Sequence, residues 1–189
     1  MVKRAGLKGG SSVLDAGCGQ GFFTWLFADL GFAAVGVDIS IEGIHAAERE
    51  YSSSPARYVV GDIRHLELDG QFDCVFTRSC SLFNSQAFDE FHDATDRLLT
   101  YVKPGGILIF DYYTKLNRRK TSRSWIYHPL AVAIKHFSHY PQAQVFLSLR
   151  FDTIALGSLA FTSPVTRINA LLSRYTGIGG ELVALVKKK

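Results

Sequence analysis

Several features are scarce or missing in this chain, and each absence excludes a class of protein. The chain has three cysteines, Cys18, Cys74 and Cys80, whose spacing fits no metal-binding motif. Their odd number also fits no closed set of disulfide bonds, so the sequence predicts a reduced protein of the cytoplasm. No segment approaches the roughly 20 consecutive apolar residues of a membrane-spanning helix. Residues 1–10 hold no apolar run, which argues against a signal peptide.

Acidic residues are scarce in the second part of the chain. Residues 112–189 hold 12 Lys and Arg against two acids, Asp152 and Glu181, for a net charge of +10. Residues 1–111 hold 9 Lys and Arg against 15 Asp and Glu, for a net charge of −6. This polarity predicts an anionic partner on the C-terminal side. The alternative is that three of these charges form a solvated tail at 187–189.

The most informative stretch reads VLDAGCGQG and covers residues 13–21. It predicts a short buried strand, then a glycine-rich turn, then an apolar helix from Phe22. Glycine is needed where a chain reverses tightly and a ligand lies against bare backbone. The helix N-terminus offers unpaired N–H groups and a positive dipole end to an anionic group. The stretch therefore predicts a cradle for a nucleotide-type cofactor, and a turn without a ligand is the alternative.

The glycine spacing separates two kinds of cofactor. A dinucleotide-binding turn would read G-x-G-x-x-G, whereas Gly17, Gly19 and Gly21 form G-x-G-x-G, preceded by Asp15. This pattern resembles motif I of the class I S-adenosylmethionine-dependent methyltransferases. The resemblance implies S-adenosylmethionine as cofactor, with Asp15, Gly17, Cys18, Gly19 and Gly21 at its binding site.

A second stretch strengthens the resemblance. The turn at 103–106, Lys-Pro-Gly-Gly, leads into an apolar strand at 107–111, as in that family. The alternation of apolar strands with helices independently predicts a doubly wound parallel sheet. Helices are expected over 87–100, from or across Pro129 within 125–137, and over 163–172. With a strand six within 145–161 and a last strand at 180–186 that pairs antiparallel in the family, we expect an α/β fold. Its sheet is expected to be Rossmann-like, seven-stranded and mostly parallel, with helices on both faces.

Further cofactor contacts are predicted at the ends of the second and third strands, which are expected at 33–38 and 57–60. Asp38 follows Gly21 by 17 positions, close to the spacing at which an acid accepts hydrogen bonds from ribose hydroxyls. Ile39 comes directly after it, and a helix cap is the alternative role for Asp38. The resemblance implies that Asp62 accepts from the adenine amino group and that Ile63 packs on the ring. A loop-capping role is the alternative for Asp62.

The fourth strand is expected to deliver Arg78, Ser79, Cys80 and Ser81 to the carboxyl edge of the sheet, where ligands of open α/β sheets bind. We expect this segment to face the methionine part of the cofactor, with Arg78 and Ser79 as its predicted contacts. Enzymes that methylate base amino groups carry an Asp/Asn-Pro-Pro-aromatic motif here, and residues 78–81 depart from it. Nucleic acid is therefore disfavoured as the acceptor, although the basic C-terminal region keeps RNA modification as an alternative.

Catalytic residues are hard to predict for this chemistry. Methyl transfer from a sulfonium needs alignment and exclusion of water, and a base only where the acceptor must lose a proton. The candidates are Tyr112, Tyr113 and His128, with His136 and His139 further along, and for each histidine a packed or surface role is the alternative. Nothing resembles an acidic metal site of the catechol type, so we predict no metal.

The basic loop at 115–123 and the aromatic residues after it, Trp125, Tyr127 and Phe137, predict an acceptor-side surface. Such rings suit a lipid headgroup interface or an apolar acceptor, and an ordinary solvated loop is the alternative. We expect a single domain over 1–189, with a cofactor-binding half at 12–111 and a variable acceptor-side half at 112–189.

The predicted function is methyl transfer to a small-molecule or lipid-linked acceptor, which the positive charge suggests is anionic, with peripheral membrane contact. Two further alternatives stay open. A non-catalytic S-adenosylmethionine-binding protein is one, because residues 1–11 leave little room for the helical segment that precedes motif I in the family. An NAD-dependent oxidoreductase is the other, and the glycine spacing counts against it. The sequence gives no indication of oligomeric state.

Overall fold

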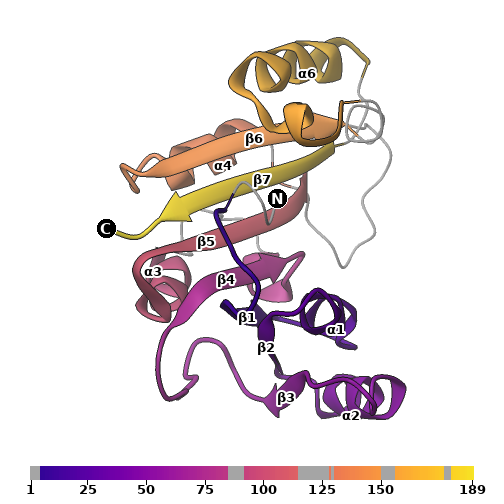
Figure 1. Cartoon of the computed structure of the whole chain (residues 1–189). Coiled ribbons are helices and arrows are strands. Elements are labelled where there is room, and N and C mark those ends of the chain that lie inside the picture. Colours follow the sequence, from indigo (N-terminus) through magenta and orange to yellow (C-terminus); the bar gives the residue numbers. More distant parts are fainter. Residues whose placement is uncertain (1–4, 85–91, 115–127, 129, 150–155, 177–179) are drawn as a thin grey trace.

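The computed structural model describes residues 5–84, 92–114, 128, 130–149, 156–176 and 180–189. Its core is a seven-stranded sheet in the order β3-β2-β1-β4-β5-β7-β6, flanked by helices (Figure 1). The strands are β1 (Ser12–Ala16), β2 (Ala33–Asp38), β3 (Arg57–Val60), β4 (Phe72–Arg78), β5 (Val102–Thr114), β6 (Ala143–Leu149) and β7 (Gly180–Lys187).

The helices occupy the connections between these strands. They are α1 (Phe22–Asp29), α2 (Ile41–Glu50), α3 (His92–Thr100), α4 (Leu130–Phe137) and α6 (Ser163–Thr176), with short 3₁₀ turns η1 (Ser81–Phe83) and η3 (Gly157–Phe161). No helix within the described residues is long and apolar enough to cross a membrane.

The pairing directions confirm the predicted mixed sheet. Strands β1 to β5 pair in parallel with their neighbours, whereas β7 runs antiparallel to both β5 and β6. The chain builds outward from β1 to β3 on one side and from β4 to β5 on the other. The strand order therefore switches between β1 and β4, and at such a point the carboxyl ends leave a crevice for a ligand.

Alternate residues of the central strands supply the two faces of the sheet with separate cores, because successive strand side chains point to opposite faces. Leu14 and Val75 pack into one core, with Leu98 of α3 and Phe137 of α4. Their sequence neighbours pack into the other core, which also receives Phe27 of α1. These near-continuous apolar strands are typical of a sheet covered on both faces.

Several predicted boundaries differ from the structure. Strand six, predicted only within 145–161, is β6 and begins at Ala143. The helix predicted to end at Leu172 is α6 and continues to Thr176. Part of the helix predicted over 87–100 lies outside the described residues.

The basic loop and most of the aromatic segment after it lie outside the described residues as well, namely 115–127 and 129. The helix expected in that region is α4, which begins at Leu130.

Candidate functional site

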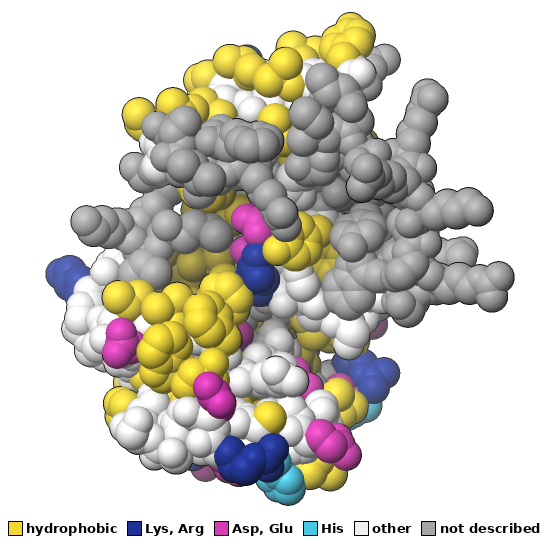
Figure 2. Space-filling view, turned by 90° about the vertical axis from the view of Figure 1, so that its right-hand side faces the viewer, with side chains coloured by type: hydrophobic (Ala, Val, Ile, Leu, Met, Phe, Trp, Pro, Cys, Tyr) yellow, Lys and Arg dark blue, Asp and Glu magenta, His cyan; other side chains and the backbone are white. Residues whose placement is uncertain are grey.

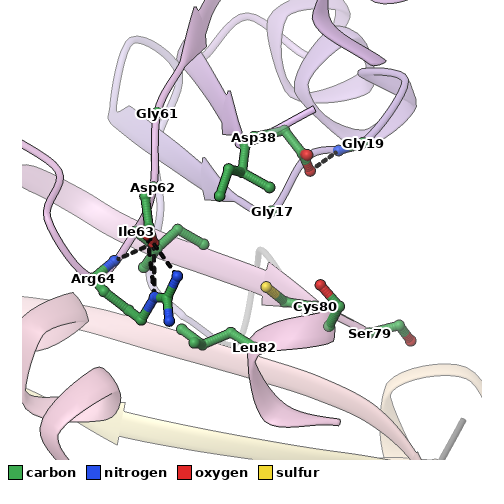
Figure 3. Close-up of a pocket in the computed structure, with 12 residues that line it drawn as sticks. Gly17, Gly19, Asp38, Gly61, Asp62, Ile63, Arg64, Ser79, Cys80 and Leu82 are labelled. Carbon is green, nitrogen blue, oxygen red and sulfur yellow. Dashed lines mark hydrogen bonds and ion pairs between the residues drawn. The ribbon is translucent and has the colours of Figure 1, made fainter. Parts of the chain in front are cut away.

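A pocket of about 540 Å³ lies at the switch between β1 and β4, within the size range of small-ligand sites. Its walls come from the β1–α1 turn, the ends of β2 and β3, and the loop after β4, as Figure 3 shows. The lining residues are Gly17, Gly19, Asp38, Ile39, Gly61, Asp62, Ile63, Arg64, Ser79, Cys80, Ser81 and Leu82. Seven of the predicted cofactor residues are therefore brought together in one cavity.

The glycines of the β1–α1 turn have different roles. Gly19 has a φ of 55°, and a Cβ added there would meet no atom within 4 Å, so its backbone faces the open pocket. Gly21 has a φ of 83°, but a Cβ there would lie 2.5 Å from the Cβ of Ala47. The turn thus exposes bare backbone to a ligand at Gly19, whereas Gly21 allows close packing of α1 against α2.

Asp38, at the end of β2, holds this turn in place. Its carboxylate accepts a hydrogen bond of 2.8 Å from the Gly19 N–H and one of 2.9 Å from the Ser40 N–H (Figure 3). The side chain of Ser40, not that of Asp38, caps the N-terminus of α2. A carboxylate has about four acceptor positions, so Asp38 has acceptor capacity left for a vicinal diol in the pocket.

Asp62 lies across the pocket from Asp38 in Figure 3. It accepts hydrogen bonds from the backbone N–H and the guanidinium of Arg64, the shortest at 2.7 Å. These hydrogen bonds from Arg64 hold the pKa of Asp62 far below its ordinary value, so the group is a permanent acceptor. Ile39 and Ile63 line the same cavity, so its polar ends are separated by apolar surface.

Ser79 combines two unusual features at the edge of the pocket. Among the described residues it is the one non-glycine residue with positive φ, at 48°. Its hydroxyl oxygen is buried and has no hydrogen-bond partner within the described part of the chain. A strained backbone and an unsatisfied polar atom are both concentrated at functional sites, which favours a ligand contact at Ser79.

Arg78, a predicted cofactor contact, is not among the residues that line the pocket. Its Nε donates to Asp111 over 3.0 Å, and its guanidinium also donates to Glu181 over 2.6 Å and to the hydroxyl of Tyr113 over 2.8 Å. Burial, with a contribution from Glu181, raises the pKa of Asp111 to about 7. Because the Ser79 N–H donates to the Asp111 carbonyl over 2.9 Å, this network anchors the strained residue beside the pocket.

Three predicted cofactor residues, Asp15, Cys18 and Gly21, build the turn rather than the pocket wall. Asp15 is buried beneath the turn and accepts a 2.7 Å hydrogen bond from the Thr24 hydroxyl. Burial raises its pKa to about 7. The thiol of Cys18 lies close to Gly36 of β2, where an added Cβ would come within 2.9 Å of it.

The catalytic candidates lie outside the pocket lining. Tyr112 is buried and stacks on Phe110, and the Tyr113 hydroxyl accepts from Arg78. The His128 ring is buried with Nε2 3.0 Å from the Phe83 carbonyl, and burial lowers its pKa.

The two later histidines lie on the same side of the sheet as α3. His136 is buried with Nε2 3.0 Å from the Thr95 hydroxyl, and His139 is exposed. The described residues contain no group of three or more His, Cys, Asp or Glu arranged to hold a metal.

Three lining residues had no predicted role, namely Gly61, Arg64 and Leu82, whereas Cys80 and Ser81 belong to the segment that was expected to face the methionine part. All of them follow the carboxyl ends of β3 or β4 within a few positions. The position of these loops in a parallel sheet was therefore the signal that could have identified them. Burial raises the pKa of Cys80 to about 11, so this thiol is a neutral part of the wall.

Sequence comparisons agree with the architecture of this pocket. Residues 13–106 match the family described as methyltransferase domain. The putative methyltransferase YqeM of Bacillus subtilis is 33% identical over 104 residues, covering 54% of this chain and 42% of that protein. A malonyl-[acyl-carrier protein] O-methyltransferase of Enterobacter lignolyticus is 28% identical over 148 residues, covering 78% and 53%. The chain spans about half the length of these curated relatives.

Solved structures show the same fold. The phosphoethanolamine N-methyltransferase 2 of Haemonchus contortus, in complex with S-adenosylhomocysteine, matches with a TM-score of 0.69 at 21% identity. The match covers 100% of this chain and 51% of that chain. Another structure of that protein contains S-adenosylmethionine. From the motif, the sheet order and these comparisons, the chain belongs to the class I S-adenosylmethionine-dependent methyltransferase family.

Proposed function

We propose that this protein transfers the methyl group of S-adenosylmethionine to a small-molecule or lipid-linked acceptor by in-line displacement. The observation that carries the proposal is the pocket at the β1–β4 switch. Two carboxylates, Asp38 and Asp62, lie on opposite sides of it, and the open backbone of Gly19 lies beside Asp38. A ribose diol and an exocyclic amine are hydrogen-bond donors that such acceptors would bind.

The pocket residues would contact the adenine, the ribose and the methionine part of the cofactor in that order along the pocket. Asp38 would accept from the ribose hydroxyls while it keeps the glycine turn closed. Asp62 would accept from the adenine amino group, with Ile39 and Ile63 packing on the base. Ser79, at the other end of the pocket, would place its unpaired hydroxyl toward the methionine part, and this agrees with its predicted role.

The bound cofactor supplies a methyl carbon that is already activated by the neighbouring sulfonium. The acceptor's lone pair forms the new bond to that carbon, and the electrons of the carbon–sulfur bond stay on sulfur, which leaves S-adenosylhomocysteine. The protein then has to bind, orient and exclude water. The walls formed by Ile39, Ile63 and Leu82 serve the last task.

The acceptor class is supported by charge and by the relatives. The net charge of +10 over residues 112–189 favours an anionic acceptor. The names of similar proteins include a malonyl-[acyl-carrier protein] O-methyltransferase and a phosphoethanolamine N-methyltransferase. Both names describe acceptors outside nucleic acid chemistry, which agrees with the missing amino-methylation motif.

Calorimetry with the purified chain tests the cofactor part of the proposal. We expect S-adenosylmethionine and S-adenosylhomocysteine to bind, and NAD to bind at least about 100-fold more weakly, a difference of about 2.7 kcal/mol. Replacing the pocket carboxylate, Asp38→Ala, should weaken binding by about 1–3 kcal/mol because ribose donors lose their partner. The matched control is Asp29→Ala, an exposed acid at the end of α1, which should bind like the parent.

Measurements of enzymatic turnover test whether the protein transfers the methyl group to an acceptor. We expect the parent to release S-adenosylhomocysteine when small anionic or carrier-linked acceptors are present. At subsaturating cofactor, the Asp38→Ala variant should release it more slowly. Cofactor binding without transfer to any acceptor of these classes would favour the non-catalytic alternative. Equal affinity for NAD, or parent-like binding by Asp38→Ala, would overturn the cofactor assignment itself.

A further inference from the structure

Helix α6 and the short 3₁₀ helix η3 before it expose apolar side chains to solvent. Ile168, Leu171 and Tyr175 are 55%, 57% and 84% exposed. These positions are spaced by three or four residues, so they lie along one side of the helix. In η3, which directly precedes α6, Leu159 is 63% exposed as well. Figure 2 shows hydrophobic side chains gathered at the top of the molecule, where α6 lies in Figure 1.

The side of α6 that faces the sheet is polar instead. The buried Asn169 side chain donates to the Leu147 carbonyl of β6 over 2.8 Å, and the Leu147 N–H donates to the Thr166 hydroxyl over 3.3 Å. A helix that only packed on its own domain would direct its apolar stripe toward the core. The exposed stripe of α6 therefore contributes little to holding the helix in place, and a contiguous exposed apolar surface indicates an interaction site.

Charge identifies the kind of partner. Helix α6 contains two arginines and no acid, and the exposed Arg167 precedes Ile168 directly. The second half of the chain has a net charge of +10. Pairing of two copies through α6 would bring like-charged surfaces together, which is unfavourable. A convex helix with an apolar stripe and an adjacent exposed arginine instead has the features of helices that lie in the headgroup region of anionic membranes.

We propose that η3 and α6 form a peripheral binding surface for an anionic lipid bilayer. Leu159, Ile168, Leu171 and Tyr175 would insert at the boundary between headgroups and acyl chains, while Arg167 binds lipid phosphates or carboxylates. The inference goes beyond the proposed methyl transfer and does not depend on it, since none of these residues lines the cofactor pocket.

Co-sedimentation of the full chain with lipid vesicles tests the proposal. The probes are vesicles of phosphatidylcholine alone and of phosphatidylcholine mixed with phosphatidylserine. We expect binding to the mixed vesicles only, and about tenfold or greater loss of binding in the double variant Ile168→Gln/Leu171→Gln, because burial of large aliphatic side chains drives insertion. The matched control, Leu30→Gln/Ile134→Gln, changes two residues of similar exposure, one just after α1 and one on α4, and should bind like the parent.

A second pair of variants tests the electrostatic contribution. Arg167→Gln should weaken binding about 5-fold at low salt, the effect of one basic residue near an anionic surface, and the difference should shrink as salt rises. Its control is Arg57→Gln, an exposed arginine at the start of β3, which should have no effect.

The outcomes of these experiments distinguish an anionic bilayer from a second copy of the chain as the partner of this surface. Parent-like vesicle binding by the double variant, equal binding to neutral vesicles, or no vesicle binding by the parent would each overturn the proposal. So would a parent dimer in sedimentation velocity that the double variant converts to a monomer, because the surface would then be an interface between copies. A cooperative thermal unfolding transition close to that of the parent serves as the folding check for every variant. If the double variant does not fold, the single change Tyr175→Ser is expected to weaken binding in the same direction.

Discussion

Three acidic residues lie in the pocket wall or in the turn beneath it, and each one is held in a different environment. Asp38 accepts from two backbone N–H groups, Asp62 is paired with Arg64, and Asp15 is buried with Thr24 as its hydrogen-bond donor. All three acids stand at or just after strand ends, a position that the sequence shows directly. Their partners are set by tertiary contacts, which the sequence shows much less clearly.

Arg78 illustrates this limit. Its position at the end of β4 correctly predicts the carboxyl edge, but the direction of its side chain depends on Glu181, which is 103 positions away in the sequence. A guanidinium beside two carboxylates and a tyrosine hydroxyl is drawn away from the pocket. Nothing local to Arg78 could have predicted that pairing.

The buried Asp15 makes the stability of the protein depend on pH. Its pKa is about 7 in the folded chain against an ordinary value of 3.8. A raised folded pKa contributes stability that is fully present below about pH 4 and is lost as pH rises toward 7. The isosteric variant Asp15→Asn lacks this titration. Relative to the parent, the variant should therefore gain up to about 4 kcal/mol in free energy of unfolding between pH 4 and pH 7.5.

Urea unfolding at several pH values measures this difference. The raised pKa of Asp111 contributes equally in parent and variant, so the comparison isolates Asp15. A constant difference across the pH range would contradict a titrating, buried carboxyl group at this position. The variant should keep the Thr24 interaction, because an amide oxygen can accept the same hydrogen bond.

At the scale of elements, the glycine turn separates ligand binding from packing. Gly19→Ala should cost about 1–2 kcal/mol of stability through backbone strain at positive φ, and it should weaken S-adenosylmethionine binding about tenfold or more by filling pocket space. Gly21→Ala has the same strain, and contact with Ala47 should add about 1–3 kcal/mol. Thermal unfolding and calorimetry on both variants check the contrast. Similar losses of S-adenosylmethionine affinity in both variants would contradict this separation of roles between Gly19 and Gly21.

The strands were more predictable than the segments that follow β5. Strands β2 and β3 have the predicted bounds, Ala33–Asp38 and Arg57–Val60, because each is a compact apolar run between turn residues. Strand β6 lies in a long stretch of mixed polarity without glycine or proline near its end, so only its region could be predicted. Helix α6 extends past its last leucine, Leu172, which was its predicted end, to Thr176.

At the scale of the whole molecule, the pocket joins several elements, so a ligand there should stabilise the entire fold. A ligand present at 100 times its dissociation constant adds about 2.7 kcal/mol to the free energy of unfolding. For a chain of 189 residues, this corresponds to a rise in melting temperature of about 5–10 °C. Scanning calorimetry with S-adenosylmethionine measures the shift. NAD at the same concentration is the control and should leave the transition close to that of the free protein.

The sheet order has a consequence for how the chain is made. Strand β7 lies between β5 and β6, yet the ribosome produces it after both. Until β7 emerges, β6 has no place in the sheet and β5 presents an unpaired edge of buried residues such as Leu108 and Phe110. An open apolar edge of this kind pairs readily with other chains. During synthesis this edge of β5 therefore stays open until residues 180–187 are available to pair with it.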